Sequence, residues 1–457
     1  MNGEPQPPKR APKRLSVGGC LLIGLGVMAL LMLVSCLGIV GWRSAAARRA
    51  ENMLAEISER GEPVSAAELD AYYALPDGAV DTTELWVAAM APLDGAAFSA
   101  DAGDLPVVGT SNAEIPPPGQ PWAELEDVEA LLAKYAETME RLHRAAEQGS
   151  AARYDLNFED GFAMLLEHVQ TLRGAARMLS LEAHVRAHRG DAHGAAESVH
   201  AINMLGKSLE REPVMVSQLV RIAVGGVSTD LFRRLLPHVE FSDADLQRLS
   251  KDYRTARYNE GFRRSLLGER TIGIQAFLNP AGDEALGGEL GPAAGHMLHL
   301  NRHEDLCQYL ALMEKMLAAA QKPTPQARKE LAQVKQDLAA VTSSPLNRVR
   351  YPLSTLLLPA LDAALEAAAR ANGLNDSAMT AIAIERYRRD RGRIPDDLQQ
   401  LVPDFLPAVP TDPYDGKPIR YVVKEDEYLI YCIGRDDVDD GGQGEYDPDV
   451  VFKVKRR

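Results

Sequence analysis

The sequence predicts a mainly α-helical protein with an N-terminal transmembrane helix and a small α+β domain at its C-terminus. Three features predict it: a long uncharged apolar segment near the start, Ala- and Leu-rich helical periodicity through the middle, and β-branched and aromatic stretches near the end. Of the 457 residues 46% are hydrophobic and only 6% aromatic, which favours packed helices over sandwiches or barrels. At roughly 150 residues per domain, the length suggests about three units.

Charge and cysteine content narrow the classes of partner. The chain has 50 Lys and Arg against 65 Asp and Glu, a formal charge of −15. Because nucleic-acid binding depends on neutralising phosphates, we expect no nucleic-acid partner, and favour neutral, basic or metallic ones. The four cysteines show neither CxxC nor Cys/His zinc spacing, so no disulfide framework and no structural zinc site is predicted.

Residues 1–14 are predicted to be a basic cytoplasmic tail and residues 15–42 a transmembrane helix. No charged residue occurs from Leu15 to Trp42. As a helix this segment would be about 42 Å long, against a hydrocarbon core of about 30 Å. Because a short basic tail before the first apolar span usually stays in the cytoplasm, we expect a single-pass protein of the cytoplasmic (inner) membrane. The bulk of the chain would then lie on the extracytoplasmic side.

A lipid anchor is the alternative to the helical one. The phrase Leu33-Val34-Ser35-Cys36 resembles the lipobox of bacterial lipoproteins, in which the cysteine is acylated and the preceding segment is cleaved. The apolar run continues past Cys36 to Trp42, whereas residues after a lipidation site are normally polar. The pattern therefore favours the transmembrane helix.

The middle of the chain divides into three predicted segments. Residues 43–121 are expected to form a juxtamembrane helix and a Pro/Gly-rich linker, because five prolines lie between residues 101 and 121. Residues 122–345 repeat apolar side chains at intervals of three and four, which predicts a helical bundle or an array of helical hairpins. A peptide-binding solenoid stays open. Residues 346–377 are expected to form a connecting helix.

Histidines at helical spacing are the candidate metal ligands of this region. The two groups are His184, His188, His193 and His200, and His296, His299 and His303. Side chains at i and i+4 on a helix can present two imidazoles to one metal, so a metal-dependent hydrolase is the alternative function. Val185 stands where a HExxH motif has its Glu, and no GxSxG elbow occurs. Solvated helix faces explain both groups more simply, and we expect no catalytic residues.

Residues 43 to about 372 resemble a group of membrane-anchored, Ala- and Leu-rich helical proteins of planctomycetes. The resemblance rests on phrases such as Gly61-Glu62-Pro63-Val64, Leu209-Glu210-Arg211-Glu212-Pro213 and Leu267-Gly268-Glu269-Arg270. The group has no assigned activity, so the resemblance implies an architecture and a bacterial origin without a reaction.

Residues 378–457 are predicted to form a small α+β domain. Residues 378–391 have the pattern of an amphipathic helix that Gly392 and Pro395 end. Residues 418–423 and 427–433 are β-branched and aromatic, and the polar residues 424–426 between them suit a hairpin turn. Residues 450–454 are a third candidate strand.

This part of the chain resembles the C-terminal domain of the major pseudopilin of type II secretion systems. The matching phrases occur in order at residues 381–395, 401–403, 410–421 and 431–437, with Gly441-Gly442 closing. Cys432 replaces the usual Ser, and Asp437 replaces a Gly. The resemblance implies a calcium-binding loop. Because the chain lacks the pilin processing motif, it implies a borrowed module, not a filament subunit, and any link to secretion would rest on this likeness.

The composition of the same loop supports a divalent cation independently. Between Arg435 and Asp449 there are seven acids. Calcium takes six to eight oxygens from carboxylates and loop carbonyls. We expect Ca²⁺ to be held by Asp436, which matches the family's acidic ligand, by Asp439 and Asp440, and by carbonyls near Cys432 and Ile433. A solvated acidic turn is the alternative.

Together these features predict a membrane-anchored, non-enzymatic envelope protein that works by contacting other proteins. Its helical body would carry a calcium-stabilised, pseudopilin-like interaction domain at the tip.

Overall fold

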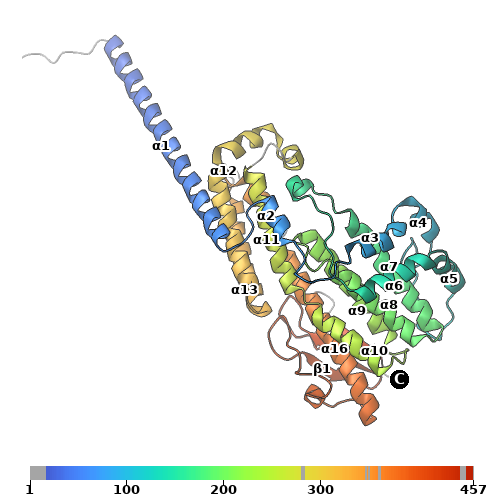
Figure 1. The fold of residues 1–457 in the computed structure, drawn as a ribbon. Coiled ribbons are helices and arrows are strands. Elements are labelled where there is room, and N and C mark those ends of the chain that lie inside the picture. The colour runs from blue at the N-terminus through green and yellow to red at the C-terminus, as the bar shows by residue number, and fades with distance from the viewer. Residues whose placement is uncertain are drawn as a thin grey trace, which may run out of the picture.

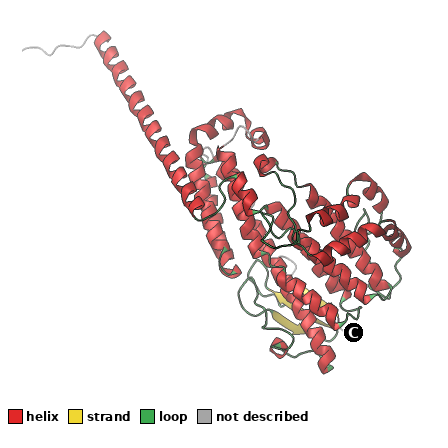
Figure 2. Ribbon diagram, viewed as in Figure 1, coloured by secondary structure: helices red, strands yellow, loops and turns green. Residues whose placement is uncertain are grey.

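The computed structural model describes residues 17–278, 284–344, 347, 350–358, 362–442 and 449–455. Within these ranges, side chains are described except at residues 17–24, 284–300, 341–342, 352, 356–357 and 362. Helices dominate, and one small antiparallel sheet lies near the C-terminus (Figures 1 and 2). The mainly helical fold, the apolar N-terminal helix and the small C-terminal sheet are confirmed.

The first helix projects from the rest of the protein (Figure 1). Helix α1 (Val17–Glu59) joins the predicted span and the juxtamembrane helix without a break, because nothing between Trp42 and Glu59 interrupts a helix. Its apolar residues 25–42 are exposed, whereas Ala46, Ala50 and Ile57 are buried at the body. The helix is long and apolar enough to span a membrane.

The segment expected to be a linker contains short helices that belong to the core. They are α2 (Ala66–Tyr72), α3 (Thr83–Met90), the 3₁₀ turn η1 (Ala91–Leu93) and α4 (Gly95–Ala102). Trp86, Met90 and Phe98 are buried in the main hydrophobic core. The expectation of a linker is wrong here, because these apolar side chains contribute buried area that a solvated linker would leave in water.

The first core is a set of antiparallel helices. Its members are α5 (Leu125–Lys134), α6 (Ala136–Gln148), α7 (Glu167–His188), α8 (Ala192–Lys207), α9 (Met215–Leu235) and α10 (Asp243–Thr255). The 3₁₀ turn η2 (Phe158–Ala163) packs in a separate small cluster with Leu69 and Tyr73. The turn between α7 and α8 lies at Gly190, which has a positive φ of +77° that favours glycine. Asp191 then caps α8 by accepting a hydrogen bond from the Gly194 amide.

A second core lies at the base of α1. It contains α11 (Asn259–Leu278), α12 (Glu284–Ala320), α13 (Thr324–Ser343) and α15 (Pro352–Leu357). Ile57 of α1 packs in this cluster with Phe262, Leu310 and Leu331. Residues 122–345 therefore contribute to two large hydrophobic cores and to two smaller clusters.

The C-terminal sheet joins the first core instead of standing apart. Strands β1 (Arg420–Val423), β2 (Glu427–Cys432) and β3 (Val450–Lys455) pair antiparallel in that order, beyond the 3₁₀ turn η4 (Leu398–Leu401). Helix α16 (Asp362–Arg391) packs on β2 and β3 and crosses the expected boundary at residue 378. A Cβ at Gly373 would lie 3.2 Å from the Cys432 sulfur, so glycine lets helix and strand approach closely.

Candidate functional site

Hydrogen bonds and two arginines hold the described part of the predicted calcium loop, since Arg420 contacts Asp439 and Arg328 pairs with Asp437 at 2.6 Å. The Asp436 carboxylate accepts from the Val438 amide at 3.1 Å. Asp439 accepts from the Tyr431 hydroxyl at 3.1 Å and from Nε of Arg420 at 3.2 Å. Among the described residues, Asp436, Asp439 and Asp440 do not bring their carboxylates into a three-ligand group.

Asp449 is the buried carboxylate next to this loop. It is 3% exposed, and one of its oxygens accepts from the Gly442 amide at 2.7 Å. The other oxygen, Oδ1, has no hydrogen-bond partner among the described residues, which exclude residues 443–448. Burial raises the pKa of Asp449, although hydrogen bonds from the Gly442 and Asp440 backbone oppose the shift. Within the described part of the acidic loop, the Oδ1 atom of Asp449 is therefore available to bind a ligand.

The remaining predicted ligands lie in the sheet or outside the described residues. Cys432 pairs with Val450 in the β2–β3 ladder, and burial raises the pKa of its thiol. The Ile433 amide donates to Asp412 at 2.8 Å. Glu445 and Asp447 fall outside the described residues.

The histidines of α7 are not on a solvated face, and that expectation is wrong. His184 is 7% exposed, and its Nδ1 is buried without a hydrogen-bond partner. His188 places Nδ1 2.9 Å from the His184 carbonyl oxygen and packs its ring 5.0 Å from that of Trp122. Burial, with Arg234 and His188 nearby, lowers the pKa of His184 to about 4. His184 is buried and His188 is half-buried because α7 packs within the first core.

The other histidines have separate surroundings. His193 lies 2.9 Å from Asp245 and 3.7 Å from Glu197, and the ligand atoms of the three lie within 4.8 Å of one another. The contact with Asp245 raises the pKa of His193. His200 contacts Asp252 at 2.7 Å. The His303 side chain is half-buried, which lowers its pKa, while the side chains of His296 and His299 lie outside the described residues.

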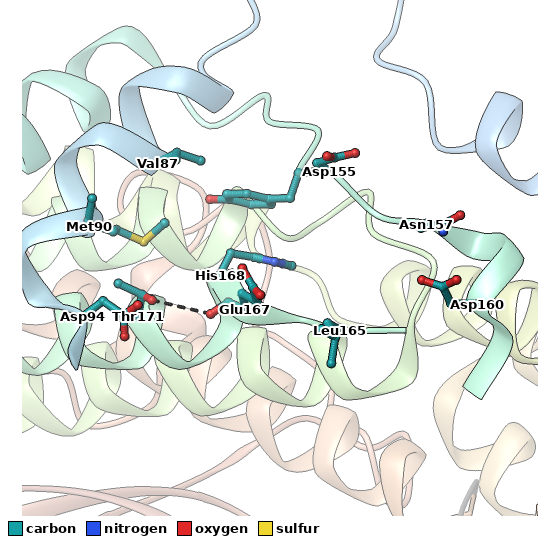
Figure 3. Close-up of a pocket in the computed structure, with 12 residues that line it drawn as sticks. Val87, Met90, Asp94, Asp155, Asn157, Asp160, Leu165, Glu167, His168 and Thr171 are labelled. Atoms are coloured by element: carbon teal, nitrogen blue, oxygen red, sulfur yellow. Dashed lines mark hydrogen bonds between the residues drawn. The ribbon is translucent and has the colours of Figure 1, made fainter. Parts of the chain in front are cut away.

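A cleft that was not predicted from the sequence lies between α3 and the start of α7. It has a volume of about 480 Å³, and Val87 and Met90 of α3 line one wall. Figure 3 shows the His168 ring at its centre, with Asp94 and Thr171 to one side and Asp155 and Asp160 to the other.

A buried carboxylate holds the histidine of this cleft. His168 Nε2 lies 3.0 Å from Oε2 of Glu212, which is 0% exposed. Ser217 donates its hydroxyl to the other oxygen of Glu212. The ring of Tyr154 stacks on His168 with centroids 4.3 Å apart. Because a carboxylate can only accept, Nε2 is the donor of this contact.

Four carboxylates surround His168 in the lining of the cleft. They are Asp94, Asp155, Asp160 and Glu167. None of the four forms an ion pair with a described residue, and no Lys or Arg lines the cleft. Glu129 shows the usual arrangement elsewhere in the protein, since it pairs with Arg189 at 2.6 Å. Four unpaired negative charges around one concave surface favour a positively charged ligand.

Sequence reasoning missed this cleft because its parts are far apart in the chain. His168 and Glu212 are separated by 44 positions, and no short motif connects them. The phrase that contains Glu212 was noted only as part of a resemblance. A carboxylate directly before Pro213 at a helix start was the one available signal.

No family model, no curated protein and no solved structure matches this chain. The function is therefore argued from the geometry of the described residues.

Proposed function

We propose that this chain is a membrane-anchored, non-enzymatic binding protein whose helical body recognises a positively charged group on a protein partner. The anchor is the exposed apolar part of α1, residues 25–42, at whose inner end the Trp42 ring contacts the Arg350 guanidinium. Burying such a helix in lipid is favourable because it removes a continuous apolar surface from water. The basic tail supports insertion into the cytoplasmic membrane with the body on the extracytoplasmic side.

Extraction of membranes tests the anchor. We expect the full chain to stay in the membrane pellet after alkaline carbonate and Cys36→Ala to behave identically, because the helix and not a lipid holds it. The double variant Leu31→Arg/Val34→Arg should move to the supernatant, since each central arginine costs about 2.5 kcal/mol or more. Ala55→Arg/Ser58→Arg, on the exposed face of the same helix near the body, is the matched control. Release of the unaltered chain would contradict the proposal.

The binding role is supported by the unpaired carboxylates of the His168 cleft. A Lys or Arg side chain entering it would meet Asp155 and Asp160 on one side and Asp94 on the other (Figure 3). Charge-assisted hydrogen bonds to carboxylates are about twice as strong as neutral ones. A cleft of about 480 Å³ has room for such a side chain.

Titration with a lysine-rich peptide tests the cleft. We expect a tetralysine peptide to bind the full chain in detergent at physiological salt and to lose about tenfold in affinity on Asp155→Asn/Asp160→Asn. The variant Glu126→Gln/Asp404→Asn removes the same charge from exposed positions outside the cleft and serves as the control. Equal weakening by both variants would show that only net charge matters and would contradict a cleft site.

A calcium-stabilised C-terminal loop is the second part of the proposal. The buried, unpartnered oxygen of Asp449 beside Asp439 and Asp440 supports it, since a cation would supply the missing interaction. To bind the ion, the Asp439 carboxylate would have to give up part of its contact with the Arg420 guanidinium. Millimolar calcium should raise the melting temperature of the full chain, and Asp449→Asn should abolish the increase. An unchanged melting temperature with calcium would contradict it.

A metal-dependent hydrolase is the alternative, and the group of His193, Glu197 and Asp245 is the geometry that favours it. Two of its carboxylates have other contacts: Glu197 pairs with Arg248, and Asp245 accepts from Ser242 in a capping box. Zinc should then bind stoichiometrically and lose affinity on His193→Ala. Absence of zinc binding would leave the binding protein as the only function in view.

A further inference from the structure

A second pocket, with the opposite charge, lies where the first core meets the sheet. It has a volume of about 230 Å³ and is lined by the end of α9, by His184 of α7, by β3 and by the chain at residues 114–118. Four cations contribute to its lining: Arg233, Arg234, Lys453 and Lys455. In a chain of formal charge −15, a pocket lined by four cations and one acid, Glu114, is unusual.

Ion pairs with nearby carboxylates do not neutralise all four of these cations. Arg233 and Arg234 share a single carboxylate, that of Asp230. Lys453 pairs with Glu427 at 2.6 Å, whereas Lys455 forms no ion pair with a described residue. Arginines in the last turn of a helix also interact with its negative end, but that effect accounts for a fraction of one charge.

His184 gives a second, independent indication of a ligand. It is 7% exposed, lines the pocket, and keeps its Nδ1 without a hydrogen-bond partner. An unsatisfied buried polar group costs about 1–3 kcal/mol, so such atoms usually have a partner that completes them. Pro116, Pro117 and Pro118 also line the pocket, and they have no amide hydrogen to donate to Nδ1.

We propose that this pocket binds a phosphate group, with Arg234 and Lys455 neutralising its charge and His184 donating a ring N–H to one oxygen. Arginine presents a planar pair of donors that matches phosphate oxygens, and lysine adds a point charge. Strand β3, which ends the described chain, contributes Lys453 and Lys455 to the lining of the pocket. The C-terminal end of the chain lies away from the exposed half of α1 (Figure 1). The phosphate is therefore soluble or carried on a small molecule, and does not belong to a lipid of the anchoring membrane.

Calorimetric titration of the full chain in a phosphate-free maltoside detergent tests the site. Inorganic phosphate and glycerol phosphate are the two probes, at pH 7 and low salt. We expect saturable binding of one equivalent and a loss of about tenfold or more with Lys455→Gln, which removes one charge-assisted contact. Tighter binding of glycerol phosphate assigns the ligand to phosphate esters, and equal binding assigns it to free phosphate.

A matched control and a spectroscopic readout separate this site from general attraction. Lys251→Gln removes an exposed lysine of α10 that does not line the pocket, and it should leave phosphate affinity unchanged. Phosphate should also shift the imidazole resonances of His184 in the unaltered chain and leave them in place in Lys455→Gln. No saturable binding of either probe, or equal affinity in the unaltered chain and in Lys455→Gln at matched melting temperatures, would overturn the proposal.

Discussion

Protonation of the buried His184 side chain directly affects the free energy of unfolding. His184 has its pKa lowered from 6.5 to about 4, since burial and neighbouring cations disfavour the imidazolium. The unfolded chain therefore binds a proton at a higher pH than the folded protein does. As the pH falls from 6.5 towards 4, this difference favours unfolding.

Comparison with a His184→Gln variant isolates this effect. We expect the free energy of unfolding of the unaltered chain, relative to the variant, to fall by up to about 3 kcal/mol between pH 6.5 and 4. Asp305, whose pKa burial raises to about 6, acts in the opposite direction, but it is present in both proteins and cancels. Denaturant titrations in phosphate-free buffer measure the difference. A pH-independent difference would show that His184 titrates normally in the folded state.

The candidate cleft shows why single residues were hard to identify in advance. His184 and His188 share a helix face because they are four positions apart, and the structure buries His184 and half-buries His188. His168 was overlooked because its partner, Glu212, belongs to another part of the chain. Spacing along one helix predicts which side chains share a face, but not what that face packs against.

At the scale of elements, one arginine connects the base of α1 to the body. Arg270 of α11 is 0% exposed and bonds Glu62, just beyond α1, at 2.8 Å and Glu314 of α12 at 2.7 Å. Arg60 contacts the same two carboxylates from the surface. Two half-buried carboxylates are thus paired with one buried guanidinium, that of Arg270, and with one exposed guanidinium, that of Arg60.

Substitution of this arginine should loosen the junction between anchor and body. Arg270→Met leaves Glu62 and Glu314 without their buried partner, and we expect a loss of about 3 kcal/mol in the free energy of unfolding. Limited proteolysis should then cut first near residues 60–64. Arg141→Met removes an exposed i,i+4 pair with Glu137 and should change stability by less than about 0.5 kcal/mol. Similar effects of the two changes would contradict the role of Arg270.

At the scale of the whole molecule, the two pockets have opposite charges on one body. The His168 cleft has only acids among its charged lining residues, apart from the histidine, while the His184 pocket is lined mainly by cations. A protein with this distribution can engage a basic and an anionic ligand at separate places. This arrangement suits a binding protein better than one reaction centre.

The side of the membrane on which the body lies is the molecular-scale prediction. In a bacterial host, protease added to spheroplasts should digest the body, residues 60–455, because the basic tail keeps the N-terminus in the cytoplasm. Introducing four lysines just after residue 42 and neutralising Lys9, Arg10, Lys13 and Arg14 should protect the body from the added protease. Protection of the unaltered body would reverse the proposed orientation.

The sequence by itself determined the features that depend on neighbouring residues. The uncharged run gave the long apolar helix, the interval of three and four gave the helices around Gly190, and the β-branched stretches gave the three strands. Only the tertiary structure decided which of these belong together. In the folded protein the sheet packs on the first core through α16, and His168 lies beside Glu212. The buried His184 lines a pocket to which four cations also contribute. These outcomes depend on packing between segments far apart in the chain, and local periodicity carries no information about such contacts.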